Sequence, residues 1–238
     1  MIDRLLGSLR VVELPGPATL FAGKCFADLG ADVLKIEPPG GDPSRRLPPL
    51  VHVESATGPV STSWLSYDIG KRHEEVALDT PAGRDRIFEL AATADILLHS
   101  YPEARATALG LDSESLRGRN ARLIEVAVTP FGYDGPYADN PASDLVQLAM
   151  SGYMHMTGDA DGRPLRPSVP MQTYLHGSNQ AFAAALLALR RRDQTGEGAF
   201  VDQSIRNTGL WMLTHTYQHW DMMRLNLKRP CRGSGPGA

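Results

Sequence analysis

One stretch constrains the fold more than any other, because residues 9–45 predict a strand, a helix and a second strand in quick succession. Leu9–Leu14 is rich in Leu and Val, which is typical of a strand buried on both faces. Residues 15–17, Pro-Gly-Pro, cannot continue a strand and end it sharply. Apolar side chains then recur at helical spacing over residues 18–29, and Val33–Ile36 is the next apolar strand. The result is a βαβ unit, which opens a parallel sheet.

The rest of the chain continues this alternation of strands and helices. It predicts an α/β fold, with a Rossmann-like parallel sheet and flanking helices. Strands are expected at Ile96–His99, Leu123–Val128 and Ala199–Ile205, with two short candidates at Trp64–Asp68 and Glu75–Asp79. Helices are expected at residues 81–94, 103–109, 113–119, 143–151, 178–192 and 206–226.

The turn after the first strand argues against a dinucleotide-binding enzyme. A phosphate-binding turn of that kind needs G-x-G-x-x-G, so that the backbone can approach a pyrophosphate. Here the turn is Pro-Gly-Pro-Ala, followed by the bulky pair Thr19 and Leu20. Glu37, at the end of the second strand, could bind a ribose, but a single acid carries little weight. An NAD-linked enzyme is therefore the least favoured hypothesis.

Composition and charge exclude several other classes. The 238 residues carry a net charge of -3 and no basic run beyond Arg190–Arg192, so nucleic acid is not an expected partner. No apolar stretch is long enough to cross a bilayer and no leader pattern opens the chain, so we expect a cytoplasmic protein. Cys25 and Cys231 are too few for a disulfide framework. His215 and His219 have no acid between them, so no metal site is expected.

Short segments spread over nearly the whole chain match one family pattern in the same order. They are residues 27–33 (ADLGADV), 35–37 (KIE), 41–42 (GD), 70–72 (GKR), 78–79 (LD), 95–97 (DIL), 100–101 (SY), 131–137 (FGYDGPY), 195–198 (TGEG) and 201–202 (VD). Together they resemble the class III CoA-transferases, the CaiB/BaiF-like family that includes formyl-CoA transferase and α-methylacyl-CoA racemase. The resemblance is to the N-terminal portion of that family, whose second half has no counterpart here.

The resemblance implies a division of the chain and a set of partners. Residues 1–205 are expected to form the family's N-terminal α/β domain, 206–228 a helical segment, and 229–238 a disordered tail. The implied substrates are an acyl-CoA and a carboxylic acid, with coenzyme A as substrate and no covalently bound cofactor. Because the family's subunits interlock, we expect an interlocked homodimer or a partner chain that carries the second half. Trp211 and Trp220 would lie on the surface that such a partner buries.

The family's chemistry depends on a carboxylate that is missing at the expected place. The resemblance implies that an aspartate attacks the acyl thioester, giving a mixed anhydride and then an enzyme-bound CoA thioester. Counted back from Thr195-Gly196 that position is Tyr174, and no acid occurs in residues 171–177. Two weak catalytic candidates are left. His176 could act as an acid or base at neutral pH, and Asp144 matches an acidic family position but is expected to cap or orient its helix.

For coenzyme A, the resemblance implies contacts that are made mainly by apolar side chains and by the backbone. The matching residues are Ala18, Leu78, Ser100, Tyr101 and Phe131. Two cationic positions of the family are replaced by Ala108 and Thr129, which predicts weaker binding because charge-assisted contacts are the strong ones. The cations that could substitute are Arg45, Lys71, Arg72 and Arg105. Solvation at the surface is the commoner state of such residues.

Three hypotheses follow from the sequence. The first is a CoA-transferase-like protein, either active through a divergent nucleophile or an inactive relative. The second is a non-catalytic subunit that binds CoA or acyl-CoA and needs a partner for the missing half. The third is the NAD-linked enzyme.

Overall fold

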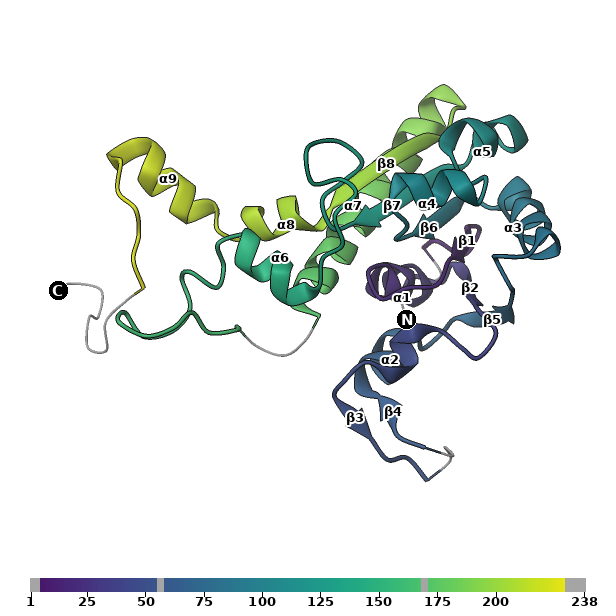
Figure 1. Ribbon diagram of the computed structural model, residues 1–238. Coiled ribbons are helices and arrows are strands. Elements are labelled where there is room, and N and C mark those ends of the chain that lie inside the picture. The colour runs from purple at the N-terminus through teal and green to yellow at the C-terminus, as the bar shows by residue number, and fades with distance from the viewer. Residues whose placement is uncertain (1–4, 55–57, 168–170, 230–238) are drawn as a thin grey trace.

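A six-stranded parallel sheet forms the centre of the molecule (Figure 1). The computed structural model describes residues 5–54, 58–167 and 171–229. The strands follow the order β5-β2-β1-β6-β7-β8, and every neighbouring pair is parallel. Their bounds are β1 Arg10–Glu13, β2 Asp32–Glu37, β5 Arg72–Glu75, β6 Ile96–His99, β7 Ile124–Thr129 and β8 Ala199–Ser204. The predicted α/β fold with a parallel sheet is confirmed.

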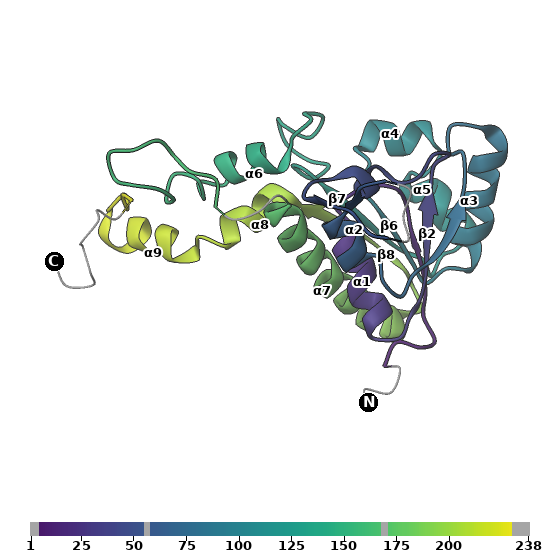
Figure 2. The ribbon, with the colours of Figure 1, turned by 90° about the horizontal axis from the view of Figure 1, so that it is seen from below.

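Helices cover both faces of this sheet (Figure 2). One face packs against α1 (Leu20–Asp28) and α7 (Gln172–Thr195). The other face packs against α3 (Pro81–Thr93), α4 (Glu103–Ala108) and α5 (Ser113–Arg119). The sheet is thus the middle layer of three, which is the architecture expected of an alternating α/β sequence.

The two hydrophobic cores explain why β1 and β2 read as nearly continuous apolar runs. Val11 and Val33 belong to the core under α1 and α7, whereas Val12 and Leu34 belong to the core on the opposite face. Successive side chains of a strand point to opposite faces, so a strand covered on both sides needs apolar residues at most positions. Lys35 interrupts the run in β2 and is nevertheless fully buried, which requires charged partners.

The strand order reverses direction between β1 and β6. The chain leaves β1 toward β2 on one side, and β6 pairs with β1 on the other. The loops that follow the two strands diverge there, although the backbone N–H of Leu14 still donates to the carbonyl of Leu98 over 2.8 Å. In open α/β sheets, the crevice outside the carboxyl ends of the strands at such a point is where ligands bind.

Two short strand predictions are wrong. Trp64–Asp68 lies mainly in a helix, α2 (Thr62–Tyr67), which begins where the Ser61 hydroxyl accepts a hydrogen bond from the backbone N–H of Trp64. The strand expected at Glu75–Asp79 occurs earlier, as β5. Its pairing partner β2 ends at Glu37, opposite Glu75, so the ladder cannot continue into the apolar residues that follow.

Two parts project from the three layers (Figure 1). One contains the hairpin of β3 (Leu50–Val51) and β4 (Val60–Ser61), which follows the 3-10 helix η1 (Pro43–Arg46). The other, which we call the arm, contains α6 (Asp144–Met150), α8 (Ile205–Trp211) and α9 (Thr214–Met223). The single helix expected over residues 206–226 is therefore two helices.

Arg229, the last described residue, contacts the segment that follows α6. Arg229 donates hydrogen bonds to the backbone carbonyls of His155, Asp159 and Gly162. Apart from Arg229, the tail expected at 229–238 falls outside the described residues. Within residues 5–54, 58–167 and 171–229, no helix combines the length and the apolar character needed to cross a membrane.

Candidate functional site

A pocket of about 410 Å³ opens at the carboxyl ends of the strands, at the point where the strand order reverses. Its walls come from the loops that follow four strands and from α4. Pro15 follows β1, Pro38 follows β2, Leu78 follows β5 and Tyr101 follows β6, while Arg105 lies on α4. This is the position that the topology assigns to a ligand. Two of the predicted coenzyme A contacts, Leu78 and Tyr101, line this one pocket.

The turn after β1 lies beside the pocket, and two more predicted residues meet there. Gly16 has a φ of +137°, and a Cβ at that position would lie 2.5 Å from the Ser100 Oγ. Only glycine fits this approach, which holds Ser100 against the turn. Ala18 is buried, and its carbonyl accepts a hydrogen bond from the hydroxyl of Ser178 on α7. Phe131 is the exception, because it follows β7 and its ring packs on Tyr137.

Arg105 gives the pocket a cation. It forms an ion pair with Asp79 on the rim, where about half of its side chain is exposed (47%). It lies one helical turn before Ala108, the position at which the sequence lacks a cation. Arg105 is thus exposed at the surface, as expected of such a cation, and it also lines the pocket.

A cluster of four buried charges lies next to the turn after β1. The Lys35 Nζ lies 3.0 Å from a carboxylate oxygen of Glu13 and 3.0 Å from one of Asp42. The Lys71 Nζ lies 2.7 Å from the other oxygen of Glu13. Asp42 in turn accepts a hydrogen bond of 2.9 Å from the backbone N–H of Gly16. The expectation of a solvated Lys71 is wrong, because its side chain is fully enclosed and its ammonium is paired.

Burial lowers the pKa of both lysines in this cluster, but the carboxylates around them outweigh that effect only at Lys35. Burial lowers the pKa of Lys35, but the carboxylates of Glu13 and Asp42 together raise it above its usual value. Lys71 shares only Glu13 as a close partner, and burial holds its pKa below the usual value. Burial also raises the pKa of Asp42, yet Lys35 and hydrogen bonds to Ser44 and Gly16 lower it below its usual value. The cluster therefore fixes the turn through charges that balance in sign.

The amino end of α7 is held by Asp144 from α6. One carboxylate oxygen of Asp144 accepts hydrogen bonds from the backbone N–H of Thr173 (2.8 Å) and from its hydroxyl (2.7 Å). The other accepts from Arg166 Nη2 (2.7 Å) and from the backbone N–H of Met171 (3.1 Å). The carboxylate thus caps a helix of 24 residues, where a negative charge complements the helix dipole.

Sequence and structure comparisons identify the family. The profile described as CoA-transferase family III matches residues 6–235. The chain belongs to CoA-transferase family III. It is 36% identical over 213 residues to the succinyl-CoA:(R)-benzylsuccinate CoA-transferase subunit BbsE of Thauera aromatica, covering 90% of this chain and 52% of that protein. It is 36% identical over 208 residues to the succinate--glutarate CoA-transferase of Agrobacterium fabrum, covering 84% and 50%.

A solved structure agrees with this assignment. The crystal structure of a CAIB/BAIF family protein from Brucella suis is 30% identical and superposes with a TM-score of 0.87, covering 94% of this chain and 59% of that one. The family III chain therefore spans about half the length of the curated relatives it matches.

Tyr174, the position at which a family III carboxylate is expected, lies in the first turn of α7. It packs against the core that contains Ala18, and its hydroxyl lies 3.5 Å from the carbonyl of Ala142. Burial, followed by the charge of Asp144, raises the pKa of Tyr174 and keeps the phenol neutral. His176 is half-buried on the same helix. Of the two catalytic candidates, His176 and Asp144, only Asp144 is a carboxylate, and both of its oxygens already accept hydrogen bonds.

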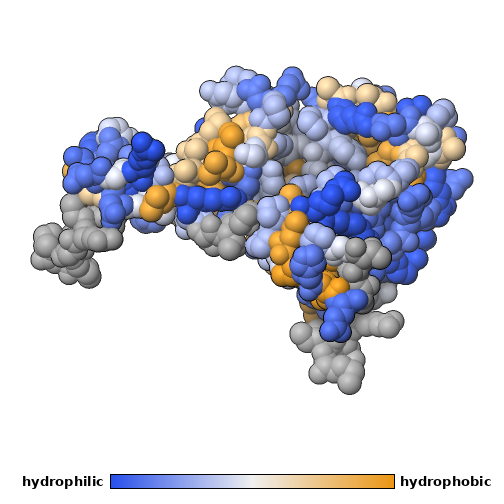
Figure 3. Space-filling view, turned by 60° about the horizontal axis from the view of Figure 1, so that its bottom comes forward, coloured by the Kyte–Doolittle hydropathy of each residue, from blue (hydrophilic) through white to orange (hydrophobic). Residues whose placement is uncertain are grey.

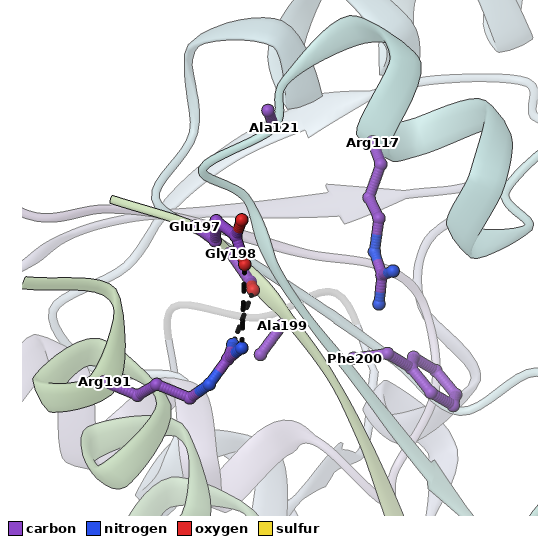
Figure 4. Close-up of a pocket in the computed structure, with 7 residues that line it drawn as sticks. All are labelled: Arg117, Ala121, Arg191, Glu197, Gly198, Ala199 and Phe200. Carbon is purple, nitrogen blue, oxygen red and sulfur yellow. Dashed lines mark hydrogen bonds and ion pairs between the residues drawn. The ribbon is translucent and has the colours of Figure 1, made fainter. Parts of the chain in front are cut away.

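A larger cavity, of about 610 Å³, lies at the opposite end of the sheet (Figure 4). Arg191 points toward Glu197 and Gly198, with which it interacts, and Arg117 lies across the cavity (Figure 4). Size alone would favour this site. We take the smaller pocket as the candidate site, because ligands of open α/β sheets bind at the carboxyl ends of the strands, whereas the cavity in Figure 4 lies at the amino end of β8.

Sequence analysis missed the buried charges beneath the turn. One signal was present, because Lys35 lies between Leu34 and Ile36 in a segment predicted to be an apolar strand of the parallel sheet. A lysine in such a strand must be paired, since a lone buried charge is strongly unfavourable. One of its partners, Asp42, lies in the matched Gly-Asp segment, so the family motif already contains one of the two carboxylates that pair with Lys35.

Proposed function

We propose that this chain binds coenzyme A thioesters at the pocket between β1 and β6, and that it does not form a covalent carboxylate–CoA intermediate by itself. One observation carries the proposal: Asp144, the carboxylate at the amino end of α7, has both oxygens occupied by hydrogen-bond donors. A nucleophile must present a free oxygen lone pair to the thioester carbon. An oxygen that caps a helix and pairs with Arg166 cannot do so without opening the start of α7.

The binding half of the proposal rests on how the pocket is built. Pro15, Leu78 and Tyr101 offer apolar walls, and Arg105 offers a guanidinium, a group that suits phosphate oxygens because its N–H donors form a planar fork. A CoA thioester combines an extended, partly apolar arm with phosphate groups. Apolar walls with one cation on the rim match that combination.

The alternative is an active transferase with a divergent nucleophile. In that case His176 or Asp144 would become modified, and the pocket would be the same. The names of the two curated relatives give their substrates as succinyl-CoA and (R)-benzylsuccinate for one, and succinate and glutarate for the other. Dicarboxylic acids and their CoA thioesters are therefore the first substrates to test.

Calorimetric titration with coenzyme A tests the binding half. Leu78→Glu would place a negative charge in the pocket wall, and we expect it to weaken binding by at least about tenfold, because one unfavourable charge contact amounts to about 1.4 kcal/mol or more. Leu187→Glu is the matched control, since Leu187 lies on α7 with 73% of its surface exposed. Equal affinities for the two variants, or no heat change with wild-type protein, would contradict the proposed binding site.

We further propose that the arm is covered by a second copy of this chain in an interlocked homodimer. Apolar side chains gather along the arm (Figure 3). The large exposed ones are Leu145, Val146, Met150, Trp211, Trp220, Met222 and Met223. A contiguous exposed apolar surface of this kind usually marks an interface. Light scattering is expected to give a dimer, and a well-behaved monomer that unfolds cooperatively would contradict this. A stable complex only with a separate partner chain would instead support the subunit hypothesis.

A further inference from the structure

A row of hydrogen-bonded polar side chains lies buried behind the pocket wall, and the proposed function assigns no role to it. His99, the last residue of β6, is fully buried, and Glu125 on the neighbouring strand β7 is nearly so. The His99 Nε2 lies 3.2 Å from one carboxylate oxygen of Glu125. The other oxygen accepts a hydrogen bond of 2.5 Å from the hydroxyl of Ser113, in the first turn of α5. Asp112, and not Ser113, caps α5, so the Ser113 hydroxyl is available for this contact.

The second nitrogen of the imidazole contacts the pocket residue Tyr101. The backbone N–H of Tyr101 donates to His99 Nδ1 over 3.3 Å. A backbone N–H can only donate, so Nδ1 must be the unprotonated acceptor and the proton of a neutral imidazole must be on Nε2. That proton points to Glu125, whose carboxylate can only accept. The two contacts therefore specify one tautomer of His99.

Tyr101 is held from three sides. His99 accepts from its backbone N–H, the Tyr133 hydroxyl donates to its carbonyl over 3.0 Å, and its ring stacks on the imidazole with 5.9 Å between centroids and 24° between planes. Burial raises the pKa of Tyr101, so its phenol stays neutral beside the pocket. The side chain of Tyr101 lines the pocket together with Leu78 and Arg105.

From this geometry we infer that His99 is a positioning residue: through a hydrogen-bonded relay that runs from Ser113 through Glu125, it sets the place of Tyr101 in the coenzyme A pocket. The inference rests on the proposed binding function. Its physical basis is preorganisation, since a wall that is already in place does not have to be ordered when the ligand binds. Glu125 fixes the tautomer, as carboxylates commonly do for histidines whose second nitrogen has a task.

Two substitutions of His99 separate positioning from packing. In His99→Asn the amide oxygen replaces Nδ1 and can still accept from the Tyr101 N–H, but the Glu125 oxygen that faces His99 loses its donor. In His99→Gln the amide nitrogen reaches toward the place of Nε2 and can still donate to Glu125, but the Tyr101 N–H loses its acceptor. A buried group left without its partner is the larger penalty in each case.

The relay predicts opposite rankings for affinity and for stability. We expect His99→Gln to weaken coenzyme A binding about fivefold and His99→Asn by less than about twofold, because one hydrogen bond contributes about 1 kcal/mol. We expect His99→Asn to lower the melting temperature more, by roughly 5 °C, since a carboxylate oxygen of Glu125 becomes unpaired. The matched controls are His155→Asn and His155→Gln, at an exposed position. If affinity and stability fall together in both His99 variants, or if neither variant changes affinity, the positioning role is wrong.

Two measurements on the backbone and the ring keep the test independent of ligand binding. Long-range nitrogen–proton NMR spectra of the wild-type protein should show His99 with the proton on Nε2 alone, and a proton on Nδ1 would overturn the inference. Amide hydrogen exchange at Tyr101 should remain slow in His99→Asn and become faster in His99→Gln. If wild-type protein fails to bind coenzyme A, the proposed function falls, and the tautomer and the exchange rates still decide the relay. If either His99 variant does not fold, the tautomer of wild-type His99 still decides the relay, and Ser113→Ala should lower the melting temperature through Glu125 while coenzyme A affinity stays within about twofold of wild type. A large loss of affinity without a loss of stability in Ser113→Ala would count against the relay.

Discussion

The turn after β1 and the amino-terminal part of α7 lie next to each other, joined by the hydrogen bond from Ser178 to the carbonyl of Ala18, yet they use their charges in opposite ways. At the turn after β1, Glu13 and Asp42 are paired with buried lysines beneath the surface, and Arg105 on the nearby pocket rim is left toward solvent. At the start of α7, the single carboxylate is turned inward to its own backbone. The first region keeps a partly exposed cation at the pocket rim, whereas the second uses its charge to hold its own backbone.

Under the proposed function, this difference would mean that binding and covalent chemistry are separated within one fold. The residues that shape the pocket come from the loops after β1, β2, β5 and β6, and none of them belongs to α7. The identity of the residue at Tyr174 on α7 therefore does not alter the residues of the pocket walls. The following predictions test whether the two regions are independent in this way.

The largest effect is expected from Lys35→Met. This change leaves Asp42 without a cation and Glu13 with Lys71 alone, and removal of one partner from a buried ion pair typically costs about 3–5 kcal/mol. Chemical denaturation should show a loss of this size. Lys24→Met, which breaks the surface pair between Lys24 and Asp28, should change the free energy of unfolding by less than about 1 kcal/mol. A similar small change for both variants would contradict the structural role of the cluster.

The next effect concerns the other region. Asp144→Asn removes the charge that Arg166 and the start of α7 share, and we expect a loss of roughly 2 kcal/mol in unfolding free energy, because hydrogen bonds to charged groups contribute about 1.5–3 kcal/mol. Coenzyme A affinity should stay within about twofold of wild type. Asp139→Asn, at an exposed position, is the control. A large loss of affinity with little loss of stability would mean that Asp144 serves the ligand and not the helix.

Arg105→Gln should reverse that pattern. We expect coenzyme A to bind roughly ten- to a hundredfold more weakly, since one charge-assisted contact contributes about 1.5–3 kcal/mol. The melting temperature should hardly change, because the pair with Asp79 is exposed. Arg117→Gln, in the cavity of Figure 4, is the matched control and should leave affinity unchanged. If Arg117→Gln weakens binding and Arg105→Gln does not, the ligand lies at the other end of the sheet.

The smallest effect is expected from acid. Hydrogen bonds and nearby cations hold the pKa of Asp42 below 3.8 and that of Glu37 below 4.5, even though burial acts in the opposite direction. A carboxyl whose folded pKa is lowered contributes stability that is complete above its usual pKa and is lost as the pH falls through the folded value. The melting temperature should therefore be flat near neutrality and decline below about pH 4.5. A melting temperature that rises on acidification would contradict these pairings.

The sequence predicted the fold well because its evidence is local. Apolar runs such as Leu9–Leu14 and the amphipathic residues 18–29 contain their own periodicity, and strands covered on both faces must be apolar. The exceptions are also local in origin. Trp64–Asp68 was predicted to be a short strand, whereas the hydroxyl of Ser61 caps the start of a helix there.

The site was harder to predict because its decisive contacts link distant residues. Asp144 and Thr173 are 29 positions apart in the sequence, and capping rules apply only to residues within a few positions of a helix end. The capping of α7 by Asp144 therefore became visible only in the fold. Leu78 and Tyr101 were identified through family resemblance, and the fold then brought them to one pocket. The roles of Lys71 and His99 depend on burial, which a single sequence does not reveal for an isolated polar residue.

The central claim is tested most directly by intact-mass and peptide mass spectrometry after incubation with succinyl-CoA and a carboxylic acid, followed by hydroxylamine. A transferase that forms a covalent carboxylate–CoA thioester would be converted to a hydroxamate at one acid, and the Agrobacterium fabrum relative can be treated in parallel as a positive control. We predict that this chain remains unmodified while calorimetry in the same buffer still detects coenzyme A binding that Arg105→Gln weakens. A hydroxamate on a peptide that contains Asp144, abolished by Asp144→Ala, would contradict the account and identify the nucleophile.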